Sequence, residues 1–244
     1  MRAYKNIYYR NRNAATHHSA QTILSMVLEW FPTIHSVADF GCGVGAWLAA
    51  SKEKGIQEIQ GVDGKWVNQD LLVIPRECFM IADLNAPISL PRRFDLAISL
   101  EVAEHLPEQC AKGFVDSLVK ASDLVLFSAA IPQQGGRNHY NEQWPDYWAS
   151  FFRDKDYEVL DVIRPKIWND KNIPYWYRQN ILLYAKKDFL TDEQRKKIRL
   201  VGAAGDLPLP LVHPELYTNK NAETLKEGWT HFRRSMRASI RRIF

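Results

Sequence analysis

The chain has 244 residues, of which 46% are hydrophobic and 25% are charged. It is therefore long enough to bury a full core, and its composition is that of a soluble globular protein. No apolar run approaches the length that spans a bilayer, and the N-terminus lacks the apolar core of a signal peptide, so we expect a cytoplasmic protein. The three cysteines lie far apart, which fits reduced thiols better than a disulfide framework or a zinc site.

The first predicted element is a helix from about Ala14 to Trp30. Apolar residues recur there at helical spacing, and Pro32 stops the helix. We expect this helix to cover one side of a following sheet and its ligand cleft.

A glycine turn follows, in which residues 37–48 read as a buried strand, a turn and a helix. Gly41, Gly43 and Gly45 let the backbone coil and approach a ligand closely, and the free N–H groups of the helix start face that ligand. The G-x-G-x-G spacing differs from the G-x-G-x-x-G of dinucleotide-binding folds. Asp39, two residues before the first glycine, suits a ligand with an ammonium group. An NAD site and a purely structural turn remain alternatives.

Two further acids are expected at strand ends. Asp63 follows a strand at 57–62, where a carboxylate can accept both hydroxyls of a ribose, as NAD enzymes also use it. Asp83 ends a third strand within 78–84 and is followed by the apolar Leu84. The alternative is that these acids only cap turns in an ordinary α/β domain.

The next strand, an apolar run at 94–100, leads directly into Glu101, Glu104 and His105. On a helical turn, residues three and four apart share a face, so these three side chains are expected to converge. Such a set suits Mg²⁺ or Mn²⁺, with His139 completing it. In the alternative without a metal, Glu101 contacts the cofactor, and His139 or His105 acts as the general base.

The remaining predicted elements are a helix at 107–120, a strand at 124–128, a helix at 145–154 and strands at 157–163 and 180–185. This alternation predicts an α/β fold with a doubly wound, mainly parallel sheet, whose ligands bind at the carboxyl ends of the strands. The loop at 133–144 opens on that edge, so the candidate catalytic residues are His139, His105 and Glu142.

Together, these motifs resemble class I S-adenosylmethionine-dependent methyltransferases over roughly residues 35–186. The resemblance implies a Rossmann-like sheet of seven strands, with the last strand antiparallel. It also implies that the cofactor-binding residues are Asp39, Gly41, Cys42, Gly43, Gly45, Asp63, Asp83, Leu84 and Glu101. The E-x-x-E-H arrangement is similar to that of metal-dependent O-methyltransferases of ubiquinone synthesis and of small-RNA ribose methylation, which implies a metal on Glu101, Glu104, His105 and His139.

The acceptor is predicted from aromatic side chains. Trp144, Tyr147 and Trp148 lie beside hydrogen-bonding groups, a combination that suits a sugar, although about half of the aromatic rings are expected in the core. The segment from His139 to Trp148 resembles bacterial methyltransferases of surface-glycan gene clusters, which implies a sugar hydroxyl of a polysaccharide or its lipid-linked precursor. The alternatives are a small phenolic metabolite, an RNA ribose, or a non-catalytic binding module.

The C-terminus is predicted to be a separate element. We divide the chain into a catalytic domain at 1–188, an extension at 189–219 and an amphipathic helix at 220–244. This last segment holds seven Lys or Arg against two Glu, whereas the whole chain has a net charge of only +4. The catalytic body is thus close to neutral, which argues against a nucleic-acid partner. The helix suits an anionic membrane surface, a glycan-synthesis partner, or packing on the body.

Overall fold

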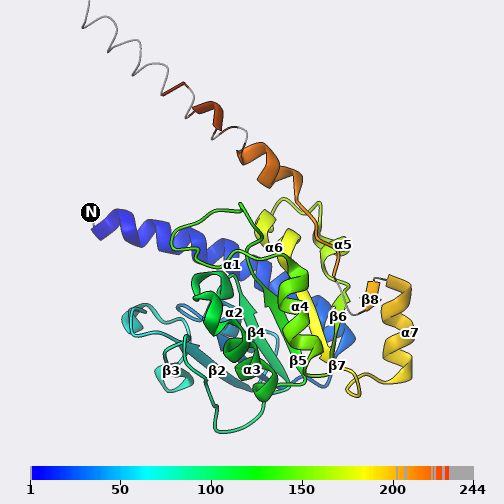
Figure 1. The fold of residues 1–244 in the computed structure, drawn as a ribbon. Coiled ribbons are helices and arrows are strands. Elements are labelled where there is room, and N and C mark those ends of the chain that lie inside the picture. Colours follow the sequence, from blue (N-terminus) through cyan, green and yellow to red (C-terminus); the bar gives the residue numbers. More distant parts are fainter. Residues whose placement is uncertain are drawn as a thin grey trace, which may run out of the picture. The chain divides into compact units, whose positions relative to one another are not determined.

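The computed structural model describes residues 2–201, 203–205, 208–220, 222, 224–226 and 229–230. By compactness the chain divides into two units, Met1–Pro210 and Leu211–Phe244. The division into segments at 188 and 219 stays a prediction. The first unit is a central sheet with helices on both faces (Figure 1).

Within the described residues the sheet has eight strands in the order β3-β2-β1-β4-β5-β7-β6-β8. Strands β3, β2, β1, β4 and β5 pair in parallel, whereas β7 is antiparallel to β5 and β6 is antiparallel to β7. The predicted seven-stranded, mainly parallel sheet is confirmed, and β8 is an added antiparallel edge. The strands are β1 Ser36–Phe40, β2 Glu58–Asp63, β3 Phe79–Ile81, β4 Leu96–Leu100, β5 Leu124–Ser128, β6 Tyr157–Asp161, β7 Leu182–Lys186 and β8 Ala203–Gly205.

The predicted helices are also present, with shifted ends. The first helix begins at Arg2, well before the predicted start, and the helices α5, α6 and α7 were not predicted. Two of these three have six residues or fewer, too short for a periodic apolar pattern to reveal. The helices are α1 Arg2–Trp30, α2 Ala46–Glu53, α3 Ala111–Ala121, α4 Pro145–Arg153, α5 Arg164–Ile167, α6 Tyr175–Asn180 and α7 Asp192–Val201.

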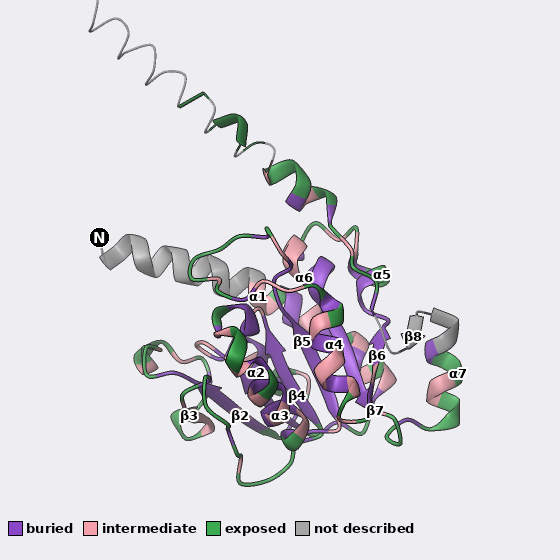
Figure 2. Cartoon of the chain, in the orientation of Figure 1, coloured by how far each residue is buried: buried purple, intermediate pink, exposed green. Residues whose placement is uncertain are grey.

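The core consists of two apolar layers, one on each face of the sheet (Figure 2). One layer takes Leu24 from α1 and Leu48 from α2. The other takes Phe114 from α3, together with Trp148 and Phe152 from α4, so Trp148 is one of the predicted aromatic residues that belong to the core. Because β1, β2, β4 and β5 run parallel between these layers, their carboxyl ends meet at one edge of the sheet, where the candidate residues lie.

The second unit is described only in part. Residues 214–220 are helical, and the side chains of Leu225 and Trp229 are exposed. Most of the predicted amphipathic helix, including all of residues 231–244, lies outside the described residues. In the part of the chain that the structure describes, no helix has the length and hydropathy needed to cross a bilayer.

Candidate functional site

The glycine turn has the left-handed backbone that its sequence predicts. Gly41 and Gly45 have φ angles of +84° and +92°, and a Cβ atom on Gly41 would lie 2.4 Å from a methyl group of Val102. The backbone at Gly41, just after β1, therefore packs directly against the side chain of Val102. This contact places the turn directly against the end of β4.

Replacing Gly41 by alanine is expected to destabilise the protein by about 1–3 kcal/mol, because the new methyl group meets Val102 and the backbone conformation disfavours a side chain. Thermal unfolding measured by circular dichroism would report this loss. The matched control is Gly113→Ala in α3, where a Cβ atom meets nothing within 4 Å and stability should stay equal or rise. Equal melting of the two variants would contradict the close packing of the turn.

Asp39 and Asp63 lie together beneath this turn. The Asp63 carboxylate accepts hydrogen bonds from the backbone N–H groups of Gly43, at 2.7 Å, and Gly64, at 2.6 Å. Burial raises the pKa of Asp63, and these two hydrogen bonds partly oppose the rise. Burial raises the pKa of Asp39 well above its usual range, and the nearby Asp63 raises it further. Two buried acids without a nearby cation form a site that a positively charged ligand would stabilise.

The affinity of the site for a ligand with an ammonium group is therefore expected to depend on pH. Because the pKa of Asp39 is raised, this carboxyl binds a proton at a higher pH than an ordinary aspartate does. The ionised form binds the ammonium group, so affinity should fall on acidification, starting above the ordinary aspartate range. Calorimetry with S-adenosylmethionine from pH 8 to pH 5 would measure this. Asp39→Asn should flatten the profile, whereas Asp70→Asn, at an exposed acid, should not.

The other predicted cofactor residues have different settings. Asp83 is exposed, and the backbone and side-chain amides of Asn85 donate to its carboxylate, which lowers its pKa. The side chain of Leu84 is buried in the core, and that of Cys42 is buried in the apolar layer beside the turn. Of this group, only Asp83 offers its side chain to a ligand without rearrangement.

A second group lies at the ends of β4 and β5. Glu104, His105 and His139 can each offer one ligand atom such that all three atoms lie within 4.8 Å of one another. The two imidazole rings are perpendicular, with their centroids 4.8 Å apart. We refer to these three residues as the EHH cluster. Glu104 is buried, His139 is half-buried and His105 is exposed, so the cluster opens to solvent on one side.

Glu104 is the unusual member of the EHH cluster. Its side chain is completely buried, and neither carboxylate oxygen has a hydrogen-bond partner. Burial raises its pKa well above the usual range, and the neighbouring Glu101 adds to the rise, while nearby backbone N–H groups offset only part of it. An orphaned buried carboxylate costs free energy unless a cation meets it, so the donor set fits a divalent metal ion.

The loop after β5 orients both histidines. Nδ1 of His105 lies 3.0 Å from the backbone oxygen of Asn138, and Nδ1 of His139 lies 2.9 Å from Oε1 of Glu142. Nε2 is then the nitrogen that each ring can offer to an ion. Glu142, predicted to be catalytic, also accepts hydrogen bonds from the backbone N–H groups of Gln133 and Gly135. Glu142 is thus the side chain that contacts Nδ1 of His139.

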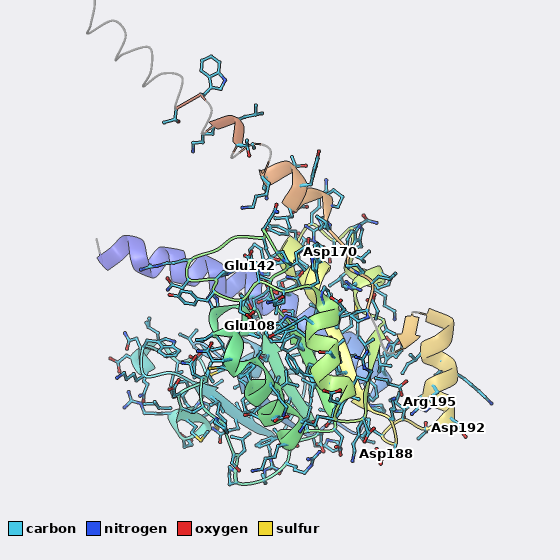
Figure 3. The ribbon with its side chains drawn as sticks, in the orientation of Figure 1. Glu108, Glu142, Asp170, Asp188, Asp192 and Arg195 are labelled. Carbon is cyan, nitrogen blue, oxygen red and sulfur yellow. The ribbon has the colours of Figure 1, made fainter. Side chains whose placement is uncertain are left out.

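Glu142→Gln is expected to weaken Mn²⁺ binding by about 10–100-fold, because the anionic partner that orients His139 is lost. Titration of the full-length protein followed by electron paramagnetic resonance would measure the affinity. Glu108→Gln, at an exposed acid on the same side of the fold (Figure 3), is the matched control and should leave the affinity unchanged. Equal affinities for both variants would argue against the EHH cluster as a metal site.

The expected helical turn that brings Glu101 together with Glu104 and His105 is wrong in its first residue. Glu101 has a φ angle of +55°, and its backbone N–H donates to Oγ and to the backbone oxygen of Ser128, so it continues the edge of the sheet. In the segment after β4, the short 3₁₀ turn comprises Ala103–His105 and leaves out Glu101. Glu101 accordingly lies beside the EHH cluster and is not a member of it.

The carboxylate of Glu101 instead ends a chain of buried amides that the sequence did not predict. Asn180 donates to its Oε1 at 3.0 Å, and Gln134 donates to its Oε2 at 2.9 Å. Asn180 and Gln179 in turn donate to the carbonyl oxygen of Gln134. These three amide residues are each at most 7% exposed. They come from the loop after β5 and from α6, so no local spacing in the sequence could have joined them.

Two exposed aromatic residues, Tyr140 and Trp144, come from the loop that carries His139. Backbone N–H groups of Tyr140 and Asn141 both donate to the carbonyl oxygen of Glu104, which fixes Tyr140 next to the cluster. The side chain of Tyr140 is 70% exposed and that of Trp144 is 40% exposed. Of the predicted aromatic set, Trp144 offers an exposed face to a ligand, whereas Trp148 belongs to the core; Tyr140 is an exposed ring that the set did not include.

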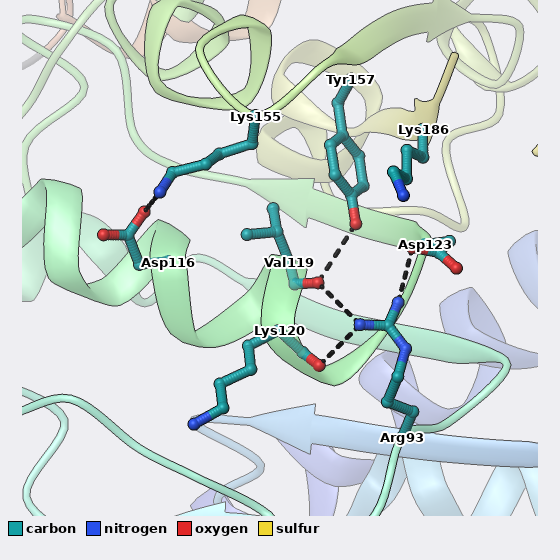
Figure 4. Close-up of a pocket in the computed structure, with 8 residues that line it drawn as sticks. All are labelled: Arg93, Asp116, Val119, Lys120, Asp123, Lys155, Tyr157 and Lys186. Carbon is teal, nitrogen blue, oxygen red and sulfur yellow. Dashed lines mark hydrogen bonds and ion pairs between the residues drawn. The ribbon is translucent and has the colours of Figure 1, made fainter. Parts of the chain in front are cut away.

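A separate cavity of about 380 Å³ lies at the opposite edge of the sheet, near the amino ends of β4 and β5 (Figure 4). Its charged groups bond to one another: Arg93 binds Asp123 and the carbonyl oxygens of Val119 and Lys120 at the end of α3. Positive charge at a helix C-terminus stabilises the helix. The charged side chains that line the cavity therefore hold α3 to the segments before β4 and β5, and we assign the cavity no ligand.

Comparison with solved structures places the fold among methyltransferases. An amino pentose methyltransferase from Micromonospora echinaspora, involved in calicheamicin biosynthesis, matches with a TM-score of 0.54 and 11% identity, over 75% of this chain and 96% of its own. A plantazolicin methyltransferase matches with a TM-score of 0.51 and 14% identity, over 74% and 89%. The methyltransferase domain of bacterial CtHen1 matches with a TM-score of 0.50 and 18% identity, over 68% and 97%. No family model and no curated protein sequence matches the chain.

Proposed function

We propose that the chain is an S-adenosylmethionine-dependent O-methyltransferase that uses a divalent cation. The observation that carries this proposal is the adjacency of two groups: the glycine turn with its buried acids, and the EHH cluster. The first group suits a cofactor with a ribose and an ammonium group, and the second suits activation of a hydroxyl. The fold shared with an amino pentose methyltransferase and a plantazolicin methyltransferase agrees with this assignment.

In this proposal the cofactor lies along the carboxyl ends of β1, β2 and β4. Asp63 holds the ribose hydroxyls, Asp39 compensates the ammonium group, and the backbone at Gly41 and Gly43 lines the path. Methyl transfer from a sulfonium is an in-line displacement, so much of the acceleration comes from holding the three reacting atoms collinear. NAD is the alternative cofactor, and it makes no use of the buried Asp39.

Glu104, His105 and His139 would hold the ion, and a bound Mg²⁺ or Mn²⁺ would lower the pKa of an acceptor hydroxyl. The contacts of the loop after β5 to both Nδ1 atoms support this role, because they would orient the two imidazoles toward the ion. In the alternative without a metal, His139 paired with Glu142 is the general base.

We infer a sugar hydroxyl as the acceptor, in a surface polysaccharide or its lipid-linked precursor. The support is the exposed ring of Tyr140, fixed beside the EHH cluster, together with Trp144. Such rings stack on the apolar face of a sugar. An RNA ribose is the second candidate, because the EHH cluster suits any ribose hydroxyl, but a body near neutral charge offers no basic track for phosphates.

The test offers radiolabelled S-adenosylmethionine and Mn²⁺ to the full-length protein with three acceptors: methyl hexopyranosides, a short RNA with a free 3′ end, and a catechol. Methyl transfer to a hexopyranoside supports the proposal. Transfer only to RNA or only to the catechol overturns the sugar assignment but keeps the enzyme class. If S-adenosylmethionine does not bind at all, the chain is a non-catalytic module. Mass spectrometry of the surface glycan with and without the gene, seeking a change of one methyl group, tests the same idea in the cell.

We further propose that residues 220–244 dock the enzyme on an anionic membrane surface, where lipid-linked glycans are made. The support is the excess of basic residues in this segment and the exposure of Leu225 and Trp229. A truncation ending at Asn219 should lose binding to anionic vesicles in a sedimentation assay, and salt should weaken binding of the full chain. Equal pelleting of both proteins would exclude this role. Loss of folding or of self-association in the truncated chain would favour packing instead.

A further inference from the structure

Glu101 lies between the two halves of the site. Its neighbour in the chain, Val102, packs against Gly41 of the cofactor turn, and Glu101 also interacts electrostatically with Glu104 and His139 of the EHH cluster. Under the proposed function, a methyl group must travel between the cofactor and an acceptor at the cluster. Glu101 therefore lies where the sulfonium and its methyl group would be.

The amide side chains around the Glu101 carboxylate donate their hydrogen bonds toward it. The amide NH₂ group of Asn180 donates both to Glu101 and to the carbonyl oxygen of Gln134, so it has no further proton to give. The NH₂ group of Gln179 donates both to Gln134 and to Asn180. The side-chain carbonyl oxygens of Gln134 and Asn180 accept, and the chain ends on the two oxygens of Glu101. The ionised form of a carboxyl group accepts hydrogen bonds and donates none, so it matches the two amide donors that meet Glu101.

Glu101 is also held in a costly backbone conformation. Its φ angle of +55° is rare for a residue with a side chain and is therefore a strained conformation. The backbone N–H of Glu101 is fixed on Ser128, which keeps this conformation in place. A carboxylate that accepts from two buried amide side chains and stands on a strained backbone is an arrangement that the fold alone does not require.

We propose that Glu101 recognises the positive charge of the sulfonium, and that Asn180 and Gln134 are the positioning residues that keep it available for this role. The cofactor before transfer carries that charge, and the thioether product, S-adenosylhomocysteine, does not. Glu101 thus favours the substrate form of the cofactor over the product form and promotes product release. This inference rests on the proposed function, because it requires that the site binds S-adenosylmethionine.

The test compares the affinities of S-adenosylmethionine and S-adenosylhomocysteine, measured by calorimetry on the full-length protein without acceptor. Glu101→Gln keeps the shape and removes the charge. It should weaken S-adenosylmethionine binding about tenfold or more relative to S-adenosylhomocysteine, as expected for one charge pair in a partly buried site. Asn180→Leu should shift the ratio in the same direction. Gln194→Leu, which removes an amide from the distant α7, should leave the ratio unchanged.

Three results would overturn the inference. If Glu101→Gln weakens both ligands equally, Glu101 does not sense the charge, while the proposed cofactor stands. If the main effect of Glu101→Gln is loss of Mn²⁺ affinity, Glu101 is a metal ligand. If the unmodified protein binds neither ligand, the proposed function fails together with the inference. Should Asn180→Leu fail to fold, as judged by circular dichroism, Gln134→Leu gives the second variant, since it removes the other amide donor to Glu101 without adding a charge and should also reduce the ratio.

Discussion

Chelation of metal ions by EDTA is expected to abolish methyl transfer by this protein, and Mg²⁺ or Mn²⁺ to restore it. The loss should be about 10²–10⁴-fold, the usual contribution of hydroxyl activation to such a reaction. Glu104→Gln should have a comparable effect, because Glu104 is the one carboxylate of the EHH cluster and its oxygens meet no other partner. Rate measurements with and without EDTA would give the size of the loss.

The stability of the same variant provides a readout that does not depend on activity. Because the pKa of Glu104 is raised, glutamine resembles the protonated side chain, and the metal-free variant should be as stable as the unmodified protein. Mn²⁺ should raise the melting temperature of the unmodified protein only, since a ligand that binds the folded state stabilises it. Full activity in EDTA would point to a histidine base. Retention of activity when both His105 and His139 are alanine would refute the proposed chemistry.

The second large effect is expected at Asp63. Asp63→Ala should weaken S-adenosylmethionine binding by about 100-fold, because the variant loses the acceptor of the ribose hydroxyls and the anchor of the N–H groups of Gly43 and Gly64. Asp83→Ala, at an exposed acid, should cost less. Calorimetry would measure both losses, with circular dichroism to confirm folding. Unchanged affinity in Asp63→Ala would remove this residue from the cofactor site, and tight NAD binding would replace the proposed cofactor.

The sequence predicted those parts of the molecule that depend on local patterns. Strand β5 lies at the predicted residues, since five buried apolar or small residues in a row allow little else. The glycine turn was predicted because a left-handed backbone requires glycine at positions such as Gly41. Glu104, His105 and His139 meet as expected, although their geometry comes from a 3₁₀ turn and a loop.

What the sequence did not predict depends on contacts between distant segments. The amides of Gln134 and Asn180 lie 46 positions apart in the chain, and only the antiparallel return of β7 beside β5 brings them to Glu101. Glu142 was named as a candidate from its type and its place in the loop, but two of its partners are backbone N–H groups, which leave no trace in side-chain spacing. The left-handed backbone of Glu101 is equally invisible, because glutamate is rarely found there.

The two hydrogen bonds from Tyr140 and Asn141 to the carbonyl oxygen of Glu104 have a dynamic consequence. They join the loop after β5 to the end of β4, so both histidines and the glutamate move as one rigid group. Amide hydrogens at 140 and 141 should therefore exchange slowly with solvent deuterium, even though the ring of Tyr140 is exposed. The ligand atoms would then be in place as soon as the protein folds. Binding of a metal ion would not need to order the loop, so little affinity would be lost to conformational entropy.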